Sequence, residues 1–274
     1  MTRAWIAAAV TLVLATGCKS EKSEQAASKL TLSGASTLAP LVSEVAKRFE
    51  KKNPGTRVDV QMGGSSRGVM DARQGLVDIG MVSRDLKPDE TDLDAHPVAR
   101  DGICIIVHQT NPVASLTDEQ LVSIFTGKIT NWKDVGGEDK PIVVVNKAEG
   151  RSTLDLFLYH FKLKNSDIKA QVVIGDNQQG IKTVETSPES IGYVSIGAAE
   201  FAAKHGEALK LLPMAGVAAS LENLHNGTFP LARTLHLVTK KGQQNELARK
   251  FITFAQSPET HDLVEKQYFI PMGE

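Results

Sequence analysis

Glycine lies in four loops of this chain, three of which also carry Ser or Thr, and each loop lies between a β-like run and a helical pattern. The loops are residues 33–37, 63–68, 149–153 and 175–180. The first turn of a helix leaves backbone N–H groups unpaired and carries a partial positive charge, which suits it to an anion. Glycine lets the backbone approach the anion, and Ser and Thr hydroxyl groups add donors. The sequence therefore predicts an anion site built from helix starts.

Four cations lie in or beside these loops and would balance the charge of an anion, namely Arg67, Arg84, Lys147 and Arg151. A single loop of this kind is weak evidence, because Ser and Thr at helix starts usually serve as N-caps. The unit of strand, Ser/Gly loop and helix recurs in both halves of the chain, however. This recurrence favours anion binding over capping.

An enzyme is the first alternative, since residues 64–68 match the G-x-S-x-G pattern of a hydrolase nucleophile between a strand and a helix. Ser66 would be that nucleophile, and it would need an acid and a histidine later in the chain. The later histidines are scattered without a distinguishing setting. The seven histidines and two cysteines also lack metal-ligand spacing, so we expect no metal and no cofactor. An anion sensor or scaffold outside transport is a further alternative.

Charge and composition narrow the classes of partner. Lys plus Arg (31) nearly cancels Asp plus Glu (32), and no basic run stands out, so no nucleic-acid partner is expected. With 274 residues, 41% of them hydrophobic and 23% charged, the chain suits a folded body of two modest lobes or one large α/β unit. Any anion must then be held by local groups rather than by the net charge.

The elements that position these loops follow from the periodicity of apolar residues. From residue 30 short β-like runs alternate with helical patterns, which predicts parallel sheets covered by helices. Pro40 suits the first turn of a helix, and residues 117–120 form a capping box that opens another. Helices in residues 246–268 are expected to complete the first lobe.

We therefore expect an α/β fold of two lobes with the ligand between them. The first lobe would consist of residues 29–107 plus 236–274, and the second of residues 108–235. The chain would cross between the lobes near residues 108–112 and return near residues 233–237. No repeat and no long linker divides the two halves.

The N-terminal residues predict export. Arg3 precedes the apolar run 5–14, as in a signal peptide, and this run is too short for a membrane-spanning helix. Residues 14–18 (Leu-Ala-Thr-Gly-Cys) resemble a lipobox with Ala15 where Leu is usual, which predicts a signal peptide over 1–17 and a lipid on Cys18. Residues 18–28 are polar and predict a flexible tether. The other cysteine, Cys104, lies in an apolar run and predicts a buried structural thiol.

Five stretches together resemble the phosphate-binding receptors of bacterial ABC importers, which are type II periplasmic-binding proteins. The stretches are residues 34–40, 63–68, 78–84, 125–132 and 191–194, of which Phe-Thr-Gly-Lys-Ile-x-Asn-Trp at 125–132 is highly characteristic. The resemblance runs from about residue 30 to the C-terminus. It implies a two-lobed fold, capture of inorganic phosphate or a related tetrahedral oxyanion without catalysis, delivery to ABC permease subunits, and a lipid-anchored, extracytoplasmic location.

The same resemblance assigns the anion contacts. Carried over by position, they fall on Ser36, Thr37, Ser65, Ser66, Ser83, Arg84, Ser152 and Thr153, with Arg67 and Arg151 as neighbouring cations. Two positions depart from the family pattern. Arg151 replaces a small serine, and we expect its guanidinium to point toward the anion. Ser83 stands where well-studied members place an aspartate that accepts the proton of hydrogen phosphate, which leaves Asp85, Glu149 or Asp176 as replacements.

Overall fold

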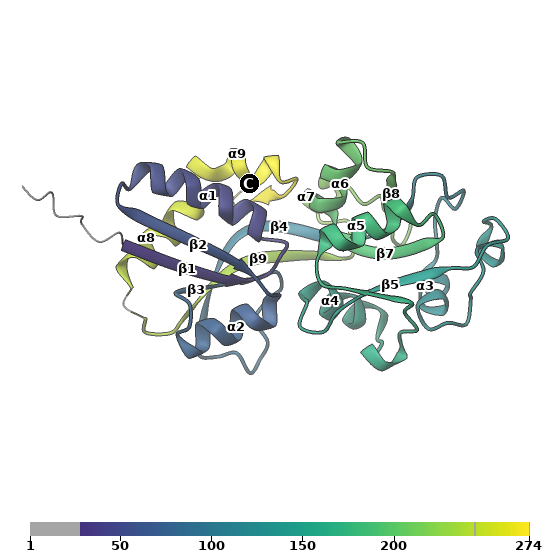
Figure 1. Cartoon of the computed structure of the whole chain (residues 1–274), viewed down its shortest axis with the longest axis horizontal. Coiled ribbons are helices and arrows are strands. Elements are labelled where there is room, and N and C mark those ends of the chain that lie inside the picture. The colour runs from purple at the N-terminus through teal and green to yellow at the C-terminus, as the bar shows by residue number, and fades with distance from the viewer. Residues whose placement is uncertain (1–27, 244, 274) are drawn as a thin grey trace, which may run out of the picture.

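Two long strands, β4 (Leu93–His108) and β9 (Ala232–Lys240), run through the middle of the molecule and join its two lobes (Figure 1). The computed structural model describes residues 28–243 and 245–273. The predicted signal peptide, Cys18 and the tether up to residue 27 lie outside the described residues. The predicted two-lobed α/β fold is confirmed.

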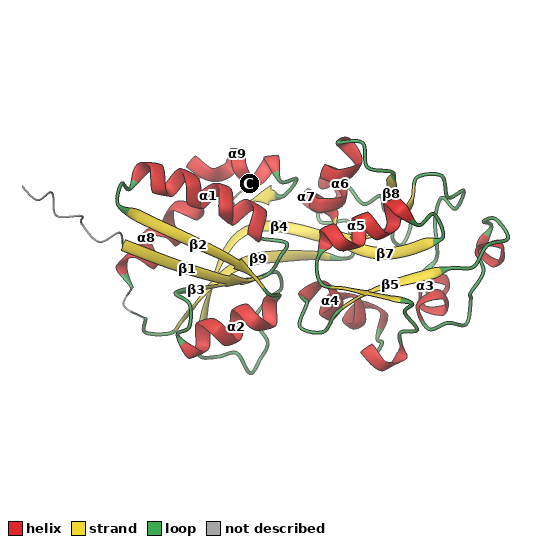
Figure 2. Cartoon of the chain, viewed as in Figure 1, coloured by secondary structure: helices red, strands yellow, loops and turns green. Residues whose placement is uncertain are grey.

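The first lobe is a sheet covered on both faces. Strands β1, β2 and β3 run parallel to one another, and β3 pairs antiparallel with β9. Helices α1 and α9 cover one face of this sheet and α2 covers the other (Figure 2). The elements of this lobe are β1 (Ser28–Gly34), α1 (Ala39–Lys52), β2 (Thr56–Met62), α2 (Ser65–Gln74), β3 (Ile79–Val82), α8 (Glu246–Ala255), α9 (His261–Lys266) and β10 (Ile270–Pro271).

The second lobe repeats this arrangement on the other half of the sheet, whose strand order is β2-β1-β3-β9-β4-β7-β5-β6, with β8 and β10 pairing with β4. Helices α5 and α6 lie on one side, and α3 and α4 lie on the other (Figure 2). The elements are α3 (Asp118–Phe125), β5 (Val143–Lys147), α4 (Ser152–Phe161), β6 (Val172–Ile174), α5 (Asn177–Thr186), β7 (Ser190–Ser195), α6 (Ile196–Lys204), β8 (Leu209–Leu212) and α7 (Leu221–His225).

Local sequence signals account for several of these boundaries. Pro40 lies in the first turn of α1, whose apolar positions are all buried. Thr117 and Gln120 form the predicted capping box at the start of α3, with each side chain bound to the other residue's backbone N–H. The C-terminal helices return to the first lobe as predicted, since Phe49 of α1 meets Phe251 of α8 with ring centroids 5.2 Å apart.

Each lobe has its own apolar core. One cluster joins β1, α1, β3 and α8, and the other joins β4, α3, α4, α5 and β7. Cys104 is fully buried in the second cluster, which confirms the predicted structural thiol, and burial raises the pKa of that thiol. A third, small cluster lies where α2 meets β3 and β9. The two large separate cores allow the lobes to behave as two bodies joined by β4 and β9.

The crossing on β4 lies earlier in the chain than the sequence predicted. β4 pairs with β9 over residues 93–102 and with β7 and β8 over residues 103–108. The apolar run 103–107 was expected in the first lobe, but its side chains pack in the second core. Asp101 and Gly102 directly precede this run. The crossing therefore lies next to a charged residue inside β4 and not at the end of the strand.

Candidate anion-binding site

Six strands end at the boundary between the lobes. Register places the C-terminal ends of β1, β2 and β3 on one side of this boundary and those of β5, β6 and β7 on the other, because β4 and β9 run through both lobes in opposite directions. Helices α1, α2, α4, α5 and α6 begin just after these ends. The boundary therefore collects helix starts from both lobes, as the sequence predicted.

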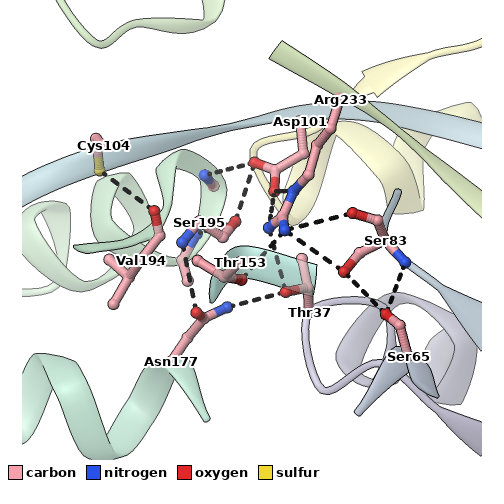
Figure 3. A network of polar contacts seen from close by, with 12 residues as sticks. Thr37, Ser65, Ser83, Asp101, Cys104, Thr153, Asn177, Val194, Ser195 and Arg233 are labelled. Atoms are coloured by element: carbon pink, nitrogen blue, oxygen red, sulfur yellow. Dashed lines mark hydrogen bonds and ion pairs between the residues drawn. The ribbon is translucent and has the colours of Figure 1, made fainter. Parts of the chain in front are cut away.

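Arg233 on β9 occupies the centre of this boundary (Figure 3). Its side chain is 2% exposed. Nη1 donates to Thr153 Oγ1 at 3.2 Å and to the carbonyl oxygen and hydroxyl of Ser83 at 3.4 Å each, and Nη2 donates to Thr37 Oγ1 at 3.3 Å. One guanidinium thus joins hydroxyl groups from both lobes. We call Thr37, Ser65, Ser83, Asp101, Thr153 and Arg233 the Arg233 cluster.

Asp101 on β4 orients this guanidinium. Its Oδ2 accepts from Arg233 Nε at 3.0 Å and from Nη2 at 2.7 Å. Its Oδ1 accepts from Ser195 Oγ at 3.0 Å and from the Gly197 N–H at 3.3 Å. Both oxygens of this fully buried carboxylate are therefore engaged by protein donors. Asp101 fixes the direction of Arg233 and leaves Nη1 turned toward the hydroxyl groups.

Three of the five helix starts at the boundary lack a side-chain cap. The N-cap residues Leu38, Gly64 and Arg151 of α1, α2 and α4 form no side-chain cap hydrogen bond. Side chains do cap α3, α5, α6, α7 and α8. Helix α9, which continues a 3₁₀ turn, is the other described α-helix without such a cap. Three helix starts at the boundary thus present N–H groups that no side chain of their own cap satisfies.

The serines of these loops are not N-caps. Ser65 and Ser152 are the first helical residues of α2 and α4, one position after the N-cap. Ser65 Oγ accepts from the Ser83 N–H at 3.1 Å. Ser152 Oγ is buried without a hydrogen-bond partner among the described residues, with the residue 2% exposed. A buried hydroxyl without a partner at an uncapped helix start is suited to an external acceptor.

Asn177 and Lys147 close the second-lobe side. Asn177 Nδ2 donates to Thr37 Oγ1 of the first lobe at 3.2 Å, and its Oδ1 accepts from Lys147 Nζ at 3.1 Å. Lys147 Nζ also donates to the Asp176 carbonyl at 2.7 Å. Burial lowers the pKa of Lys147 to about 7, opposed by the charge of Asp176 and reinforced by the charge of Arg233.

The structure brings together part of the set that the sequence nominated. Thr37, Ser65, Ser83 and Thr153 lie in the Arg233 cluster, and Ser152 adjoins Thr153 at the start of α4. Ser66 donates its backbone N–H to Gly150 O at 3.2 Å across the boundary. Ser36 lines a neighbouring pocket of about 420 Å³ that it shares with Thr37 and Asn177.

The three arginines that the sequence predicted for the site lie outside the Arg233 cluster or at its edge. Arg84 donates through both terminal nitrogens to Glu90 at 2.8 Å, and Arg67 pairs with Asp71 at 3.1 Å with half of its side chain exposed. Arg151 extends over Gly64 of the first lobe and leaves no room there for a side chain, because a Cβ at position 64 would lie 2.8 Å from Gly150 O and 2.9 Å from Arg151 Cδ. With a φ of +92°, position 64 suits glycine for its backbone as well.

Sequence reasoning missed Arg233, Asp101, Asn177 and Ser195 as members of the site. A signal was present for two of them, because Asp101 lies just before the apolar run 103–107 and Arg233 lies within the β-like run 231–238. A charge buried in a strand requires a partner, and these two residues are each other's partner. From sequence, residues 233–237 were expected only to form a crossing segment.

Comparison with known proteins agrees with this geometry. The family model of the PBP superfamily domain matches residues 19–259. The phosphate-binding protein PstS of Bacillus subtilis is 30% identical over 92% of this chain and 83% of its own length. The chain belongs to the PBP superfamily, among the PstS-like proteins.

Solved structures of PstS-like proteins share the arrangement of the lobes. A candidate phosphate ABC transporter substrate-binding protein of Clostridium perfringens, solved with bound phosphate, superposes with a TM-score of 0.82 at 33% identity and covers 89% of this chain and 99% of its own. An ABC-type phosphate transport receptor of Vibrio cholerae reaches 0.73 at 30% identity, over 88% and 99%. Within residues 28–243 and 245–273, no helix is long and apolar enough to cross a membrane.

Proposed function

We propose that this PstS-like protein captures inorganic phosphate between its lobes outside the cytoplasm and delivers it to the permease of an ABC importer. The observation that carries the proposal is the Arg233 cluster, in which one buried guanidinium meets hydroxyl groups of both lobes beside uncapped helix starts. The names of the related proteins, which include phosphate-binding proteins and a phosphate transport receptor, support it.

The chemistry of these groups matches a tetrahedral oxyanion. The four oxygens of such an anion point in different directions and need hydrogen-bond donors on several sides. The boundary offers a guanidinium, several hydroxyl groups and backbone N–H groups from different directions. Hydrogen bonds to a charged acceptor are stronger than neutral ones, and more so where water is excluded. Because donors come from both lobes, an anion would stabilise their closed arrangement, which a permease can recognise by shape.

The proton of hydrogen phosphate needs an acceptor, and each candidate carboxylate is bonded to a group outside the Arg233 cluster. Asp85 is largely exposed and contacts His236. Glu149 accepts from Asn165, and Asp176 caps α5. We therefore propose that a hydroxyl oxygen of the Arg233 cluster accepts this proton, because a hydroxyl accepts as well as donates. A hydroxyl that can also donate to sulfate rejects sulfate less strongly than a carboxylate does.

Calorimetry with phosphate, sulfate, arsenate and molybdate tests this proposal. We expect phosphate to bind at one site, and sulfate to compete measurably. If none of these anions releases heat on mixing and none raises the melting temperature, the proposal is overturned and a scaffold is favoured. The hydrolase alternative predicts labelling by a fluorophosphonate that Ser66→Ala abolishes; in the described part of the chain no histidine forms a hydrogen bond with Ser66.

Export and a lipid anchor at Cys18 complete the proposal, and their support is the sequence of residues 1–18. Partition in Triton X-114 should place the protein in the detergent phase, and Cys18→Ser should move it to the aqueous phase. Wild-type protein that stays wholly aqueous would contradict the anchor without affecting anion binding.

A further inference from the structure

Lys147 is a buried lysine that the Arg233 cluster does not contain. It ends β5, only 3% of the residue is exposed, and its Nζ donates to the Asp176 carbonyl and to Asn177 Oδ1. Among the described residues no carboxylate lies within ion-pair distance of it, whereas Arg233 has one and Arg84 has two. A buried ammonium without a carboxylate partner is costly unless another negative charge balances it.

The charged and titratable groups around Lys147 come from four elements. Asp176 at the start of α5 favours the ammonium form, and Arg233 on β9 and Arg151 at the start of α4 oppose it. On β7, the Tyr193 hydroxyl accepts from the Lys147 backbone N–H at 3.4 Å. Two cations therefore act on Lys147 against one carboxylate, and the local charge is short of negative groups.

Lys147 also determines which way the Asn177 amide points. Asn177 Oδ1 faces two donors, Lys147 Nζ at 3.1 Å and the Ser195 N–H at 3.4 Å, so Nδ2 is turned toward Thr37 Oγ1 in the first lobe. Exchange of the amide oxygen and nitrogen would place N–H groups against an ammonium that can only donate. The charge on Lys147 thus directs an amide donor across the boundary.

We propose that Lys147 is a positioning residue of the anion site, which holds Asn177 Nδ2 toward the interlobe boundary and whose ammonium is balanced by the bound anion. The inference rests on the proposed function and deepens it. Lys147 acts through Asn177 and through its charge, without touching the anion itself.

Proton uptake during phosphate binding tests this role, because replacing a lysine that is only structural would not change it. Burial holds the pKa of Lys147 near 7, and an anion at the boundary would raise that pKa because it favours the charged form. A ligand that prefers the protonated form takes up protons when it binds, and its affinity falls as pH rises above the free-protein pKa. Phosphate binding at about pH 8 should therefore include proton uptake by Lys147.

The experiment compares full-length wild type, Lys147→Met, Asn177→Ala and the double variant by phosphate calorimetry in two buffers of different ionisation enthalpy. Each single variant should lose roughly tenfold in affinity, the size expected for one hydrogen bond that serves a charged ligand. The double variant should lose less than the product of the two losses. Lys147→Met should also bind phosphate with less proton uptake than wild type. Because phosphate titrates by itself, the difference between the two proteins is the quantity to compare.

Lys210→Met is the matched control, since Lys210 is another lysine of the second lobe whose Nζ donates to a main-chain carbonyl, that of Asn111. It should bind like wild type. Equal affinity and equal proton uptake in wild type and Lys147→Met from about pH 6 to pH 9 would overturn the inference. If the affinity loss of the double variant equals the product of the two single losses, the positioning role is overturned. If Lys147→Met does not fold, Lys147→Gln serves the same comparison, and wild type that binds no phosphate would instead remove the proposed function.

Discussion

Arg233 and Arg84 are both buried, and both lie beside a carboxylate, yet we propose an anion-binding role for Arg233 alone. Glu90 accepts from both terminal nitrogens of Arg84 at 2.8 Å, so the fork of that guanidinium is filled. Asp101 instead uses a single oxygen for Nε and Nη2 of Arg233, and Nη1 faces hydroxyl groups. The side of the guanidinium that the carboxylate occupies decides whether an arginine is structural or available.

The largest effect should follow from changes at Arg233. Arg233→Met removes the central cation, and we expect at least a hundredfold loss of phosphate affinity by calorimetry. Arg233→Lys should lose less, roughly tenfold, because an ammonium keeps the charge without the fork. Removing the cation alone leaves Asp101 buried and unpaired, so the variant Arg233→Met/Asp101→Asn serves as a neutral, better tolerated form. Affinity within threefold of wild type in this double variant, with an unchanged melting temperature, would reverse the ranking of the two arginines.

Thr153→Val should have the next largest effect, because it removes one hydroxyl of the Arg233 cluster and keeps the shape of the side chain. We expect a roughly tenfold loss of phosphate affinity, as for one hydrogen bond to a charged group. Thr183→Val is the control, since Thr183 in the same lobe only bonds the Gln179 carbonyl on α5. Similar affinities for the two variants would mean that Thr153 contacts Arg233 but not the anion.

These two arginines also show which features of the fold and of the candidate site can be predicted from the sequence. Strand and helix periodicity, Pro40 and the capping box at Thr117 report local rules, and they placed most elements and the helix starts at the boundary correctly. Arg84 was predicted as a contact because it lies beside the Ser/Gly loops and because the family resemblance assigns an anion contact to its position. Its partner Glu90 and the partnership of Arg233 with Asp101, 132 positions away, arise only when the chain folds. Which nitrogen faces which lobe cannot be inferred from spacing along the chain.

Arg84→Met should leave phosphate affinity within threefold of wild type and lower stability instead. Breaking a buried ion pair that leaves one charge behind costs about 3 kcal/mol or more in the free energy of unfolding. Burial raises the pKa of Glu90, but hydrogen bonds from Arg84 and from the Lys87 N–H outweigh this and bring the pKa below its ordinary value of 4.5. A lowered carboxyl pKa stabilises the fold above about pH 4.5, and the contribution is lost as pH falls.

The pH dependence separates this structural role from a binding role. Without Arg84, the pKa of the buried Glu90 should rise, so the variant should unfold in acid at a higher pH than wild type. Arg73→Met is the control, since Arg73 and Asp92 form an exposed pair in the same lobe and should contribute less than about 1 kcal/mol. A tenfold loss of affinity with unaltered urea and acid unfolding would return Arg84 to the binding site.

The smallest effect is expected at Asp155, the residue through which Arg84 reaches the other lobe. Asp155 on α4 lies 3.5 Å from Arg84 Nε and 3.8 Å from Lys87 Nζ, with 31% of its side chain exposed. Such a partly solvated pair is worth roughly 0.2–1 kcal/mol, and it can favour the closed arrangement by no more than that. Asp155→Asn should therefore lower phosphate affinity by about fivefold at most, and the loss should shrink between about 0.05 M and about 0.5 M salt. Asp139→Asn, which breaks an exposed pair with Lys133 in the same lobe, should change nothing. A larger loss that is independent of salt would mean that Arg84 is coupled to the anion through Asp155, and the contrast between a filled and an open guanidinium would no longer explain the site.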